Sequence, residues 1–445
     1  MASTASNRWR QTYRQKLCSA AQAARLVEPV STVYLSGNAA TPRALTEALA
    51  DRAQDLRDVR AAHVLLLGDD PFRTGPARDS ISHLSFFAGP GDREAILERR
   101  AQYVPCHLSD IPNLLRRRRP RVDVAMLSVA PPDNHGLMSL GCEVLASLAA
   151  AEAAEKVVVQ VNPAMPRVHG DCFLHVDDVD AIVEHESPLP ELLSPPPSET
   201  EMRIAEHIVR LVPDGATVQL GIGGIPNAVV SLLEQRRDLG IHSEMISDGV
   251  MHAYESGVVT GRRKSLHKGK IVTTFALGSR EFYDWIHDNG AIEAHPCDHT
   301  NDPVIAARND RLVSINSAIS VDLTGQVNAD SIGHRIYSGV GGQLDFVRAA
   351  RLSHEGRSII AMPSTASGGR VSRIVPRLAA GAGVVTTRAD VDTIVTEHGV
   401  AELSGRTIAE RVECLMAIAD PEFRPELENA VQEVLESFVA LSRGT

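Results

Sequence analysis

A glycine-rich stretch at residues 216–230, ATVQLGIGGIPNAVV, constrains the fold of this 445-residue chain more than any other segment. Its first residues are typical of a β-strand, and Pro226 suits the first helical position because its missing N–H would have no intrahelical partner. Glycines let a ligand approach the main chain, and the N–H groups of a helix start bind negative charge. The stretch therefore predicts a strand, an anion-binding turn and a helix. The turn comprises Gly221, Ile222, Gly223, Gly224 and Ile225.

A second strand is expected to begin at Ile241, about twenty residues after the turn, parallel to the first strand. It contains Glu244 in an otherwise apolar run, and a carboxylate is costly to bury without partners. The residues alone leave two interpretations open. Glu244 is either a reactive carboxylate beside the glycine turn, or a structural one that pairs with a Lys or Arg or caps the turn at 247–249.

Length, charge and cysteine usage exclude several classes of protein. The chain exceeds the roughly 250 to 300 residues at which one core stops growing, so two domains are expected. A formal net charge of −11 argues against a general nucleic-acid or membrane binder, and no apolar run approaches the ~18 residues of a membrane span. Six scattered cysteines are typical of reduced thiols in a cytoplasmic protein. The 17 histidines show no metal-binding spacing, so no metal is expected.

Three segments occur twice in the same order, which implies an internal duplication. The pairs are STVYLSGNAATPRAL at 31–45 with the glycine-rich stretch, VPCHLSDIP at 104–112 with HPCDHTNDP at 295–303, and residues 122–141 with residues 311–333.

The two copies differ where chemistry is expected. The first copy has GNAA at 37–40 in place of the glycine cluster, and an apolar residue near Val64 or Leu65 in place of Glu244. The second copy is therefore expected to carry the reaction, with the first as the opposite wall of a cleft. The Pro-rich segment 194–200 cannot sustain helix or sheet and is predicted to be the linker.

The predicted fold class is α/β, with two similar open α/β domains that arise from the duplication. The N-terminal domain is expected at 1–193, and the C-terminal domain, which carries Glu244, at 201–445.

Several long motifs in order resemble the acetyl-CoA hydrolase/transferase family of class I CoA-transferases, with the members that act on 4-hydroxybutyrate the most similar. The motifs are SVAPPDNHG, NPAMPRVHGD, GIGGIPNAV, HSEMISDG, SINSAISVDLTGQV, SGVGGQLDF and AMPSTASGGRVSRI. The resemblance covers essentially the whole chain, and the fold that it implies, two α/β domains with the active site between them, agrees with the duplication.

The resemblance also implies roles for individual residues. Glu244 in HSEM matches the family's catalytic glutamate, and residues 221–225 match the glycine loop that contacts CoA and the thioester oxygen. Ile319, after SINSA, and Gly342 in GVGGQ match further CoA-contacting positions. Coenzyme A is then a substrate, and no cofactor or metal is implied.

The function implied by the resemblance is CoA transfer between short-chain carboxylates, acetate with 4-hydroxybutyrate or butyrate, through a glutamyl-CoA thioester. The expected partners are acyl-CoA and short-chain carboxylates, without nucleic acid or membrane, and with a homodimer as a candidate assembly. Alternatives are an acyl-CoA hydrolase of the same fold, a succinate or itaconate CoA-transferase, and a CoA-binding protein without catalysis. A dinucleotide binder is disfavoured because GIGGIP is not GxGxxG.

Overall fold

The computed structural model describes residues 5–193 and 195–439, and contacts divide the chain into two units. Unit 1 comprises Met1–Leu193, Glu244–Asp248 and Lys270–Asn301, and unit 2 comprises Ser194–Ser243, Gly249–Gly269 and Asp302–Thr445. The predicted domain boundary after Leu193 coincides with the first boundary between the units. The predicted ranges were continuous, whereas two segments of the second half, one of them carrying Glu244, group with unit 1. Ser194 of the predicted linker lies outside the described residues.

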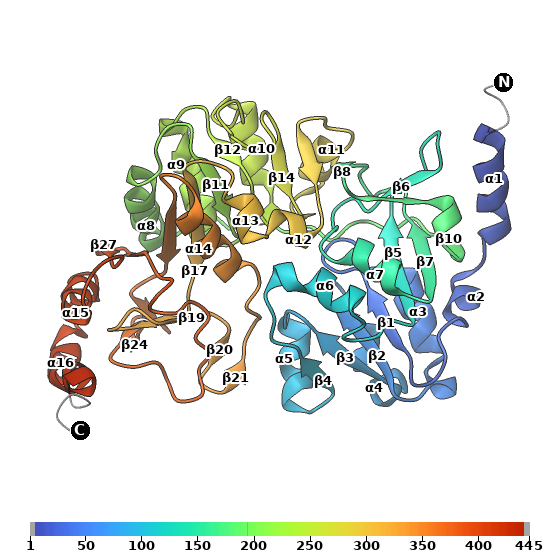
Figure 1. The fold of residues 1–445 in the computed structure, drawn as a ribbon. Helices are drawn as coiled ribbons and strands as arrows, with labels where there is room; N and C mark the ends of the chain where they lie inside the picture. The colour runs from blue at the N-terminus through green and yellow to red at the C-terminus, as the bar shows by residue number, and fades with distance from the viewer. Residues whose placement is uncertain (1–4, 194, 440–445) are drawn as a thin grey trace. The chain divides into compact units, whose positions relative to one another are not determined.

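Unit 1 is built on a seven-stranded sheet whose neighbouring strands are all parallel (Figure 1). Most residues of its strands are buried, as expected of a parallel sheet with helices on both faces. In order across the sheet they are β10 (Ala181–Glu184), β7 (Lys156–Val161), β5 (Val124–Val129), β1 (Thr32–Leu35), β2 (Val59–His63), β3 (Ile81–Ser85) and β4 (Ala101–Tyr103).

Unit 2 is built on a six-stranded sheet in which only the last pair of strands is antiparallel. The helix α8 (Glu199–Arg210) opens this unit, so the last two residues of the predicted linker are helical, and the N-cap residue Ser198 accepts a hydrogen bond from Glu201 N. In order the strands are β12 (Gly240–Ile241), β11 (Thr217–Leu220), β17 (Leu312–Ser317), β22 (Arg357–Ala361), β26 (Thr393–Thr396) and β27 (Gly399–Glu402).

The two sheets confirm the predicted α/β class and show the same strand order. The order β10-β7-β5-β1-β2 in unit 1 corresponds to β26-β22-β17-β11-β12 in unit 2. The duplicated segments fall on matching strands, since residues 31–45 contain β1 and 216–230 contain β11, while 122–141 contain β5 and 311–333 contain β17. The internal repeat is therefore a repeat of topology as well as of sequence.

The remaining elements are short or flank the sheets. The helices are α1 (Ala5–Lys16), α2 (Ala20–Ala24), α3 (Arg43–Asp51), α4 (Ala77–Ser80), α5 (Pro90–Leu97), α6 (Ile111–Arg116), α7 (Ser147–Ala153), α9 (Gly224–Leu232), α10 (Asp248–Glu255), α11 (Arg280–Ile286), α12 (Cys297–Thr300), α13 (Pro303–Ala306), α14 (Gln343–Leu352), α15 (Ile408–Ala417) and α16 (Arg424–Val439). The short strands are β6 (Leu137–Ser139), β8 (His169–Gly170), β9 (Phe173–His175), β13 (Met245–Ile246), β14 (Ile271–Thr273), β15 (Phe275–Ala276), β16 (Ile292–Ala294), β18 (Ser320–Asp322), β19 (Val327–Asn328), β20 (Ser331–Ile332), β21 (Arg335–Ile336), β23 (Thr365–Ala366), β24 (Val371–Ser372) and β25 (Ile374–Val375).

Residues 270–301 follow the second copy's first strands in sequence but pair with the first half of the chain. Strand β14 pairs with β16, and β16 pairs with β8, so that Glu293 lies opposite His169 and Ala294 opposite Gly170. Gly170 has a φ of +118°, and a Cβ there would lie 2.2 Å from the carbonyl oxygen of Ala294. A side chain at this position would therefore force the two segments apart.

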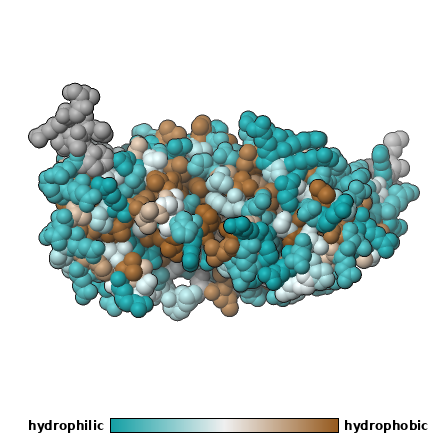
Figure 2. All heavy atoms as spheres, turned by 90° about the horizontal axis from the view of Figure 1, so that it is seen from below, coloured by the Kyte–Doolittle hydropathy of each residue, from teal (hydrophilic) through white to brown (hydrophobic). Residues whose placement is uncertain are grey.

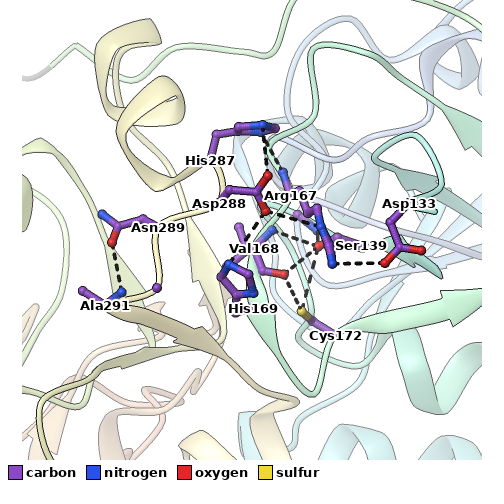
Figure 3. A network of polar contacts seen from close by, with 12 residues as sticks. Asp133, Ser139, Arg167, Val168, His169, Cys172, His287, Asp288, Asn289 and Ala291 are labelled. Carbon is purple, nitrogen blue, oxygen red and sulfur yellow. Dashed lines mark hydrogen bonds and ion pairs between the residues drawn. The ribbon is translucent and has the colours of Figure 1, made fainter. Parts of the chain in front are cut away.

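An arginine joins the same two segments through its side chain (Figure 3). Arg167 pairs with Asp133 at 3.2 Å and with Asp288 at 3.3 Å, and its main-chain N–H donates to Nδ1 of His287. His169 lies 3.7 Å from the Asp288 carboxylate. These contacts link His287 and Asp288 to the PPDNHG and PRVHGD motifs within unit 1, although Nη1 of Arg167 has no hydrogen-bond partner among the described residues.

Both hydrophobic and hydrophilic residues lie on the face of the molecule shown in Figure 2. Within residues 5–193 and 195–439, none of the helices combines the length and the apolar character needed to span a membrane. No disulfide links the six cysteines, all of which lie in the described part of the chain.

Candidate active site

The glycine turn lies where the sequence predicted it, between β11 and α9 in unit 2. Gly223 caps the helix with a φ of +117°, a conformation that favours glycine. A Cβ added at Gly221 or Gly223 would meet no described atom within 4 Å, and Ile222 is 47% exposed. The turn is thus open, with the main chain accessible to a ligand.

Two details of the turn differ from the prediction. The helix begins at Gly224, so Pro226 is its third residue and not its first; it is tolerated there because the N–H groups of the first turn have no intrahelical partner. A Cβ at Gly224 would lie 1.8 Å from Oε1 of Glu201, which caps α8. A side chain at Gly224 would therefore displace the Glu201 carboxylate from the capping box of α8, whereas Gly221 and Gly223 leave space for a ligand.

Because a Cβ fits at Gly221 without a clash, a substitution there tests whether a ligand approaches the main chain of the turn. Gly221→Ala should fold normally, because the space is open and the φ is ordinary, yet lower kcat/KM by roughly 10- to 100-fold if a thioester must approach the main chain there. Gly290→Ala is the matched control, since its Cβ also meets no described atom within 4 Å. Steady-state kinetics with one acyl-CoA donor compare the two, and equal rates would move ligand contact away from Gly221.

The two other predicted CoA-contacting positions lie at the same edge of the unit 2 sheet. Strands β11 and β17 are parallel neighbours with Leu220 opposite Ile315, so Gly221 and Ile319 both follow the carboxyl ends of their strands. Gly342 caps α14, which connects β17 to its parallel neighbour β22 and therefore begins at that edge as well. Ligands of open α/β sheets bind at this edge.

Side-chain amides that the sequence analysis missed join the ends of these strands. Gln219 and Asn316 exchange hydrogen bonds of 3.4 and 3.1 Å across β11 and β17. Ser243 Oγ donates to Leu220 O at 2.8 Å and accepts from Leu220 N at 3.2 Å. The residue before Glu244 is thereby fixed to the residue before Gly221.

Glu244 itself does not lie within a strand, contrary to the prediction. The chain leaves the unit 2 sheet at Ile241, and Glu244 precedes β13, which pairs with β15 in unit 1. Its carbonyl oxygen accepts from the N–H groups of Thr274 and Phe275, both at 3.1 Å. The boundary between the two units therefore falls between Ser243 and Glu244.

The Glu244 carboxylate has a buried polar partner. Oε2 accepts a hydrogen bond of 2.8 Å from Nδ2 of Asn301, a residue that is 0% exposed. Asn301 lies in HPCDHTNDP, one of the duplicated segments, and that repetition was the signal that could have pointed to it. An amide donor can orient a carboxylate without neutralising it, as a nucleophile requires.

The corresponding turn of the first copy is closed. Residues 37–40 are all buried, and a Cβ at Gly37 would lie 2.4 Å from the carbonyl oxygen of Leu65. The side chain of Glu143, which is 0% exposed, accepts from Ser147 Oγ at 2.6 Å and from the Gly37 N–H. A carboxyl of the protein thus occupies a main-chain donor of the first turn, whereas the second turn is open.

Burial raises the pKa of the Glu143 carboxyl from 4.5 to about 7, which predicts a pH-dependent stability. Since the folded state binds this proton more tightly, the stabilisation is complete below pH 4.5 and is lost as the pH rises through about 7, a change of about 3 kcal/mol. Glu143→Gln should remove that dependence. Chemical denaturation at about pH 5 and pH 8 measures it, with exposed Glu206→Gln as control; an unchanged pH slope in Glu143→Gln would contradict the assignment.

Comparison with known proteins relates this architecture to one family. The N-terminal domain of acetyl-CoA hydrolase/transferase matches residues 1–192, and the C-terminal domain of the same family matches residues 278–431. The chain belongs to the acetyl-CoA hydrolase/transferase family.

Relatives along the whole chain agree with that membership. The 4-hydroxybutyrate coenzyme A transferase of Clostridium kluyveri is 43% identical over 421 residues, 95% of this chain and 98% of the relative. The succinyl-CoA:cyclohexane-1-carboxylate CoA transferase of Geobacter metallireducens is 43% identical, over 95% and 96%. The crystal structure of RipA from Yersinia pestis has a TM-score of 0.90 and 39% identity, over 96% and 99%. These matches confirm the expected enzyme class, an acyl-CoA:carboxylate CoA-transferase.

Proposed function

We propose that this member of the acetyl-CoA hydrolase/transferase family transfers CoA between acetyl-CoA and a short aliphatic carboxylate, 4-hydroxybutyrate or butyrate, with Glu244 as the nucleophile. The observation that carries the proposal is the hydrogen bond from buried Asn301, which orients a carboxylate whose own main chain is fixed by Thr274 and Phe275. The activities named for the relatives support the same reaction class.

The reaction proceeds by two exchanges at the Glu244 carboxylate. An oxygen of Glu244 attacks the acyl-CoA carbonyl and the C–S bond breaks, which gives an acyl-glutamyl anhydride and CoA thiolate. The thiolate attacks the glutamyl carbonyl, releases the first carboxylate and leaves a glutamyl-CoA thioester. The second carboxylate attacks that thioester, and the released thiolate then attacks the new acyl carbonyl, which restores Glu244 and forms the second acyl-CoA.

Each step passes through a tetrahedral intermediate with an oxyanion. Main-chain N–H groups of residues 221–225 are the proposed donors to it, because the turn is open and precedes a helix start. Such donors are fixed before the reaction and need no reorganisation. Exclusion of water is required as well, since hydrolysis of the anhydride or of the glutamyl-CoA thioester would regenerate Glu244 and leave CoA free without transfer.

Monocarboxylates are the proposed substrates on charge grounds. A second carboxylate in the acyl pocket is expensive to desolvate without a cationic partner. No Lys or Arg lies within GIGGIP or HSEM, the two segments assigned to the reaction. One methylene in an apolar pocket changes binding by only about 1 to 3 kcal/mol, so acids of neighbouring lengths should overlap as substrates.

Acyl exchange and thiol release, measured on the same preparation, test the proposal. Acetyl-CoA with butyrate or 4-hydroxybutyrate should give the new acyl-CoA, detected by chromatography, with little release of thiol. Thiol release that exceeds exchange would identify a hydrolase, and neither product would indicate CoA binding without catalysis. A kcat/KM for succinate or itaconate above those for the monocarboxylates would overturn the substrate assignment.

A further inference from the structure

Two histidines and an aspartate meet in the interior of unit 1. His63 ends β2, His83 lies in the neighbouring strand β3, and Asp92 lies in the first turn of α5; they are 0%, 3% and 5% exposed. Nε2 of His63 lies 3.0 Å from Nδ1 of His83, and Oδ1 of Asp92 lies 3.7 Å from the first atom and 3.9 Å from the second. Three possible ligand atoms thus converge from three elements.

The separations of these three atoms suit one metal ion. The circle through atoms with these separations has a radius of about 2.1 Å, the length of Zn–N and Zn–O bonds. An ion at its centre would lie in the plane of the three atoms, and side-chain shifts that bring all three separations to roughly 3.3 Å would give the spacing of tetrahedral ligands. Three protein ligands of the imidazole and carboxylate type leave one position of a tetrahedron for water.

The outer contacts orient two of the ligands. Nε2 of His83 lies 3.2 Å from Oδ2 of Asp70, so that the proton of His83 belongs on Nε2 and the lone pair of Nδ1 faces the cluster. The other oxygen of Asp92 accepts from Ser85 Oγ at 2.9 Å and from Gly89 N at 3.0 Å. Among the described residues, Nδ1 of His63 has no hydrogen-bond partner, so no contact fixes its tautomer.

Charge gives a further argument for a cation. Asp70 and Asp92 place two carboxylates beside two imidazoles in a buried region, and buried charges require compensation. One divalent ion balances both carboxylates. We infer that His63, His83 and Asp92 bind one divalent transition-metal ion, with Zn²⁺ as the best fit and Asp70 as the residue that orients His83.

The ion would join β2, β3 and α5, which is a structural role separate from the reaction proposed for Glu244. The sequence analysis expected no metal because these residues are twenty and nine positions apart and match no ligand-spacing pattern. The parallel pairing of β2 and β3 and the start of α5 bring them together. The competing arrangement has a proton on His63 Nε2, shared with His83, and no metal.

The metal content of the full-length protein shows whether the cluster binds a metal ion or holds a proton shared by His63 and His83. After dialysis against a chelator, titration with Zn²⁺ should give about one bound ion per chain and a higher thermal midpoint. Asp92→Asn and His83→Gln should lose this site, and Asp70→Asn should weaken it roughly 10- to 100-fold. Exposed His252→Gln is the control that should bind as the wild type does.

Two measurements keep the inference open to refutation even if the variants fold poorly. Wild-type protein that binds less than about a tenth of an ion per chain, with an unchanged thermal midpoint, would establish the proton-bridged arrangement. Co²⁺ in place of Zn²⁺ should give the intense visible absorption of a tetrahedral site; weak octahedral absorption would show loose surface binding and overturn the assignment.

Discussion

Glu244→Ala is expected to lower the rate of acyl exchange by about 10⁴-fold or more, because it removes the nucleophile while leaving binding of CoA largely intact. The wild-type protein incubated with acetyl-CoA should gain the mass of CoA on the peptide that contains Glu244, and the variant should not. Glu244→Asp keeps the charge but shortens the side chain, so the carboxylate should lose the 2.8 Å hydrogen bond that the Asn301 amide donates to Glu244. The exchange rate of Glu244→Asp should lie between the rates of the wild type and of Glu244→Ala.

The control for this experiment is Glu206→Gln, which removes an exposed carboxylate from α8 and should retain wild-type exchange. Intact-mass spectrometry and initial-rate kinetics provide independent readouts. Acyl exchange by the wild type without any CoA adduct, combined with a Glu244→Ala variant that retains more than a tenth of the rate, would exclude a covalent route through this residue.

The second large effect is expected at Asn301. Asn301→Ala removes the donor to Glu244 Oε2 and should lower kcat by roughly 100-fold, since a small displacement of a reacting group has that cost. Asn301→Asp places a second carboxylate beside Glu244, and two like charges raise the pKa of one of the pair. Because the nucleophile must be ionised, the acidic limb of the kcat/KM profile should move to higher pH in this variant.

The pH profile distinguishes positioning from a merely structural role. Asn289→Ala is the matched control, because Asn289 lies in the same segment and its side chain bonds only to the main chain of Trp285 and Ala291 among the described contacts. It should lower stability without shifting the profile. If Asn301→Asp shows the same profile as the wild type, Asn301 does not act on the ionisation of Glu244.

Local sequence patterns were sufficient to predict the repeated α/β architecture and the glycine turn. Strand, turn and helix signals at 216–230 depend on neighbouring residues, and the structure has the same elements in the same order. Glu244 stood out because a carboxylate in an apolar run is costly. Its catalytic role, together with the roles of Ile319 and Gly342, stays a prediction for the experiments above.

Element boundaries and polar partners were harder to predict. Helix α9 begins at Gly224, two residues before Pro226, and Gly224 lies against Glu201 of another helix. The Asn301 amide reaches Glu244 across 57 positions of sequence. No local pattern reports such contacts, because hydrophobic periodicity tells which face of an element is buried but not which segment buries it.

The sequence by itself determined the α/β class, the duplication and the residue types available for acyl transfer, since all three follow from local pattern and repetition. Only the tertiary structure decided which of the two corresponding turns is closed and which segments of the second half group with the first. Leu65 and Glu143 close the first turn, while the second remains open. Strand β16 pairs with β14 on one side and with β8 on the other, and residues 270–301, including Asn301, thereby group with unit 1. Pairing between distant strands is chosen by register and packing over the whole fold, which is why it could not be read from either copy alone.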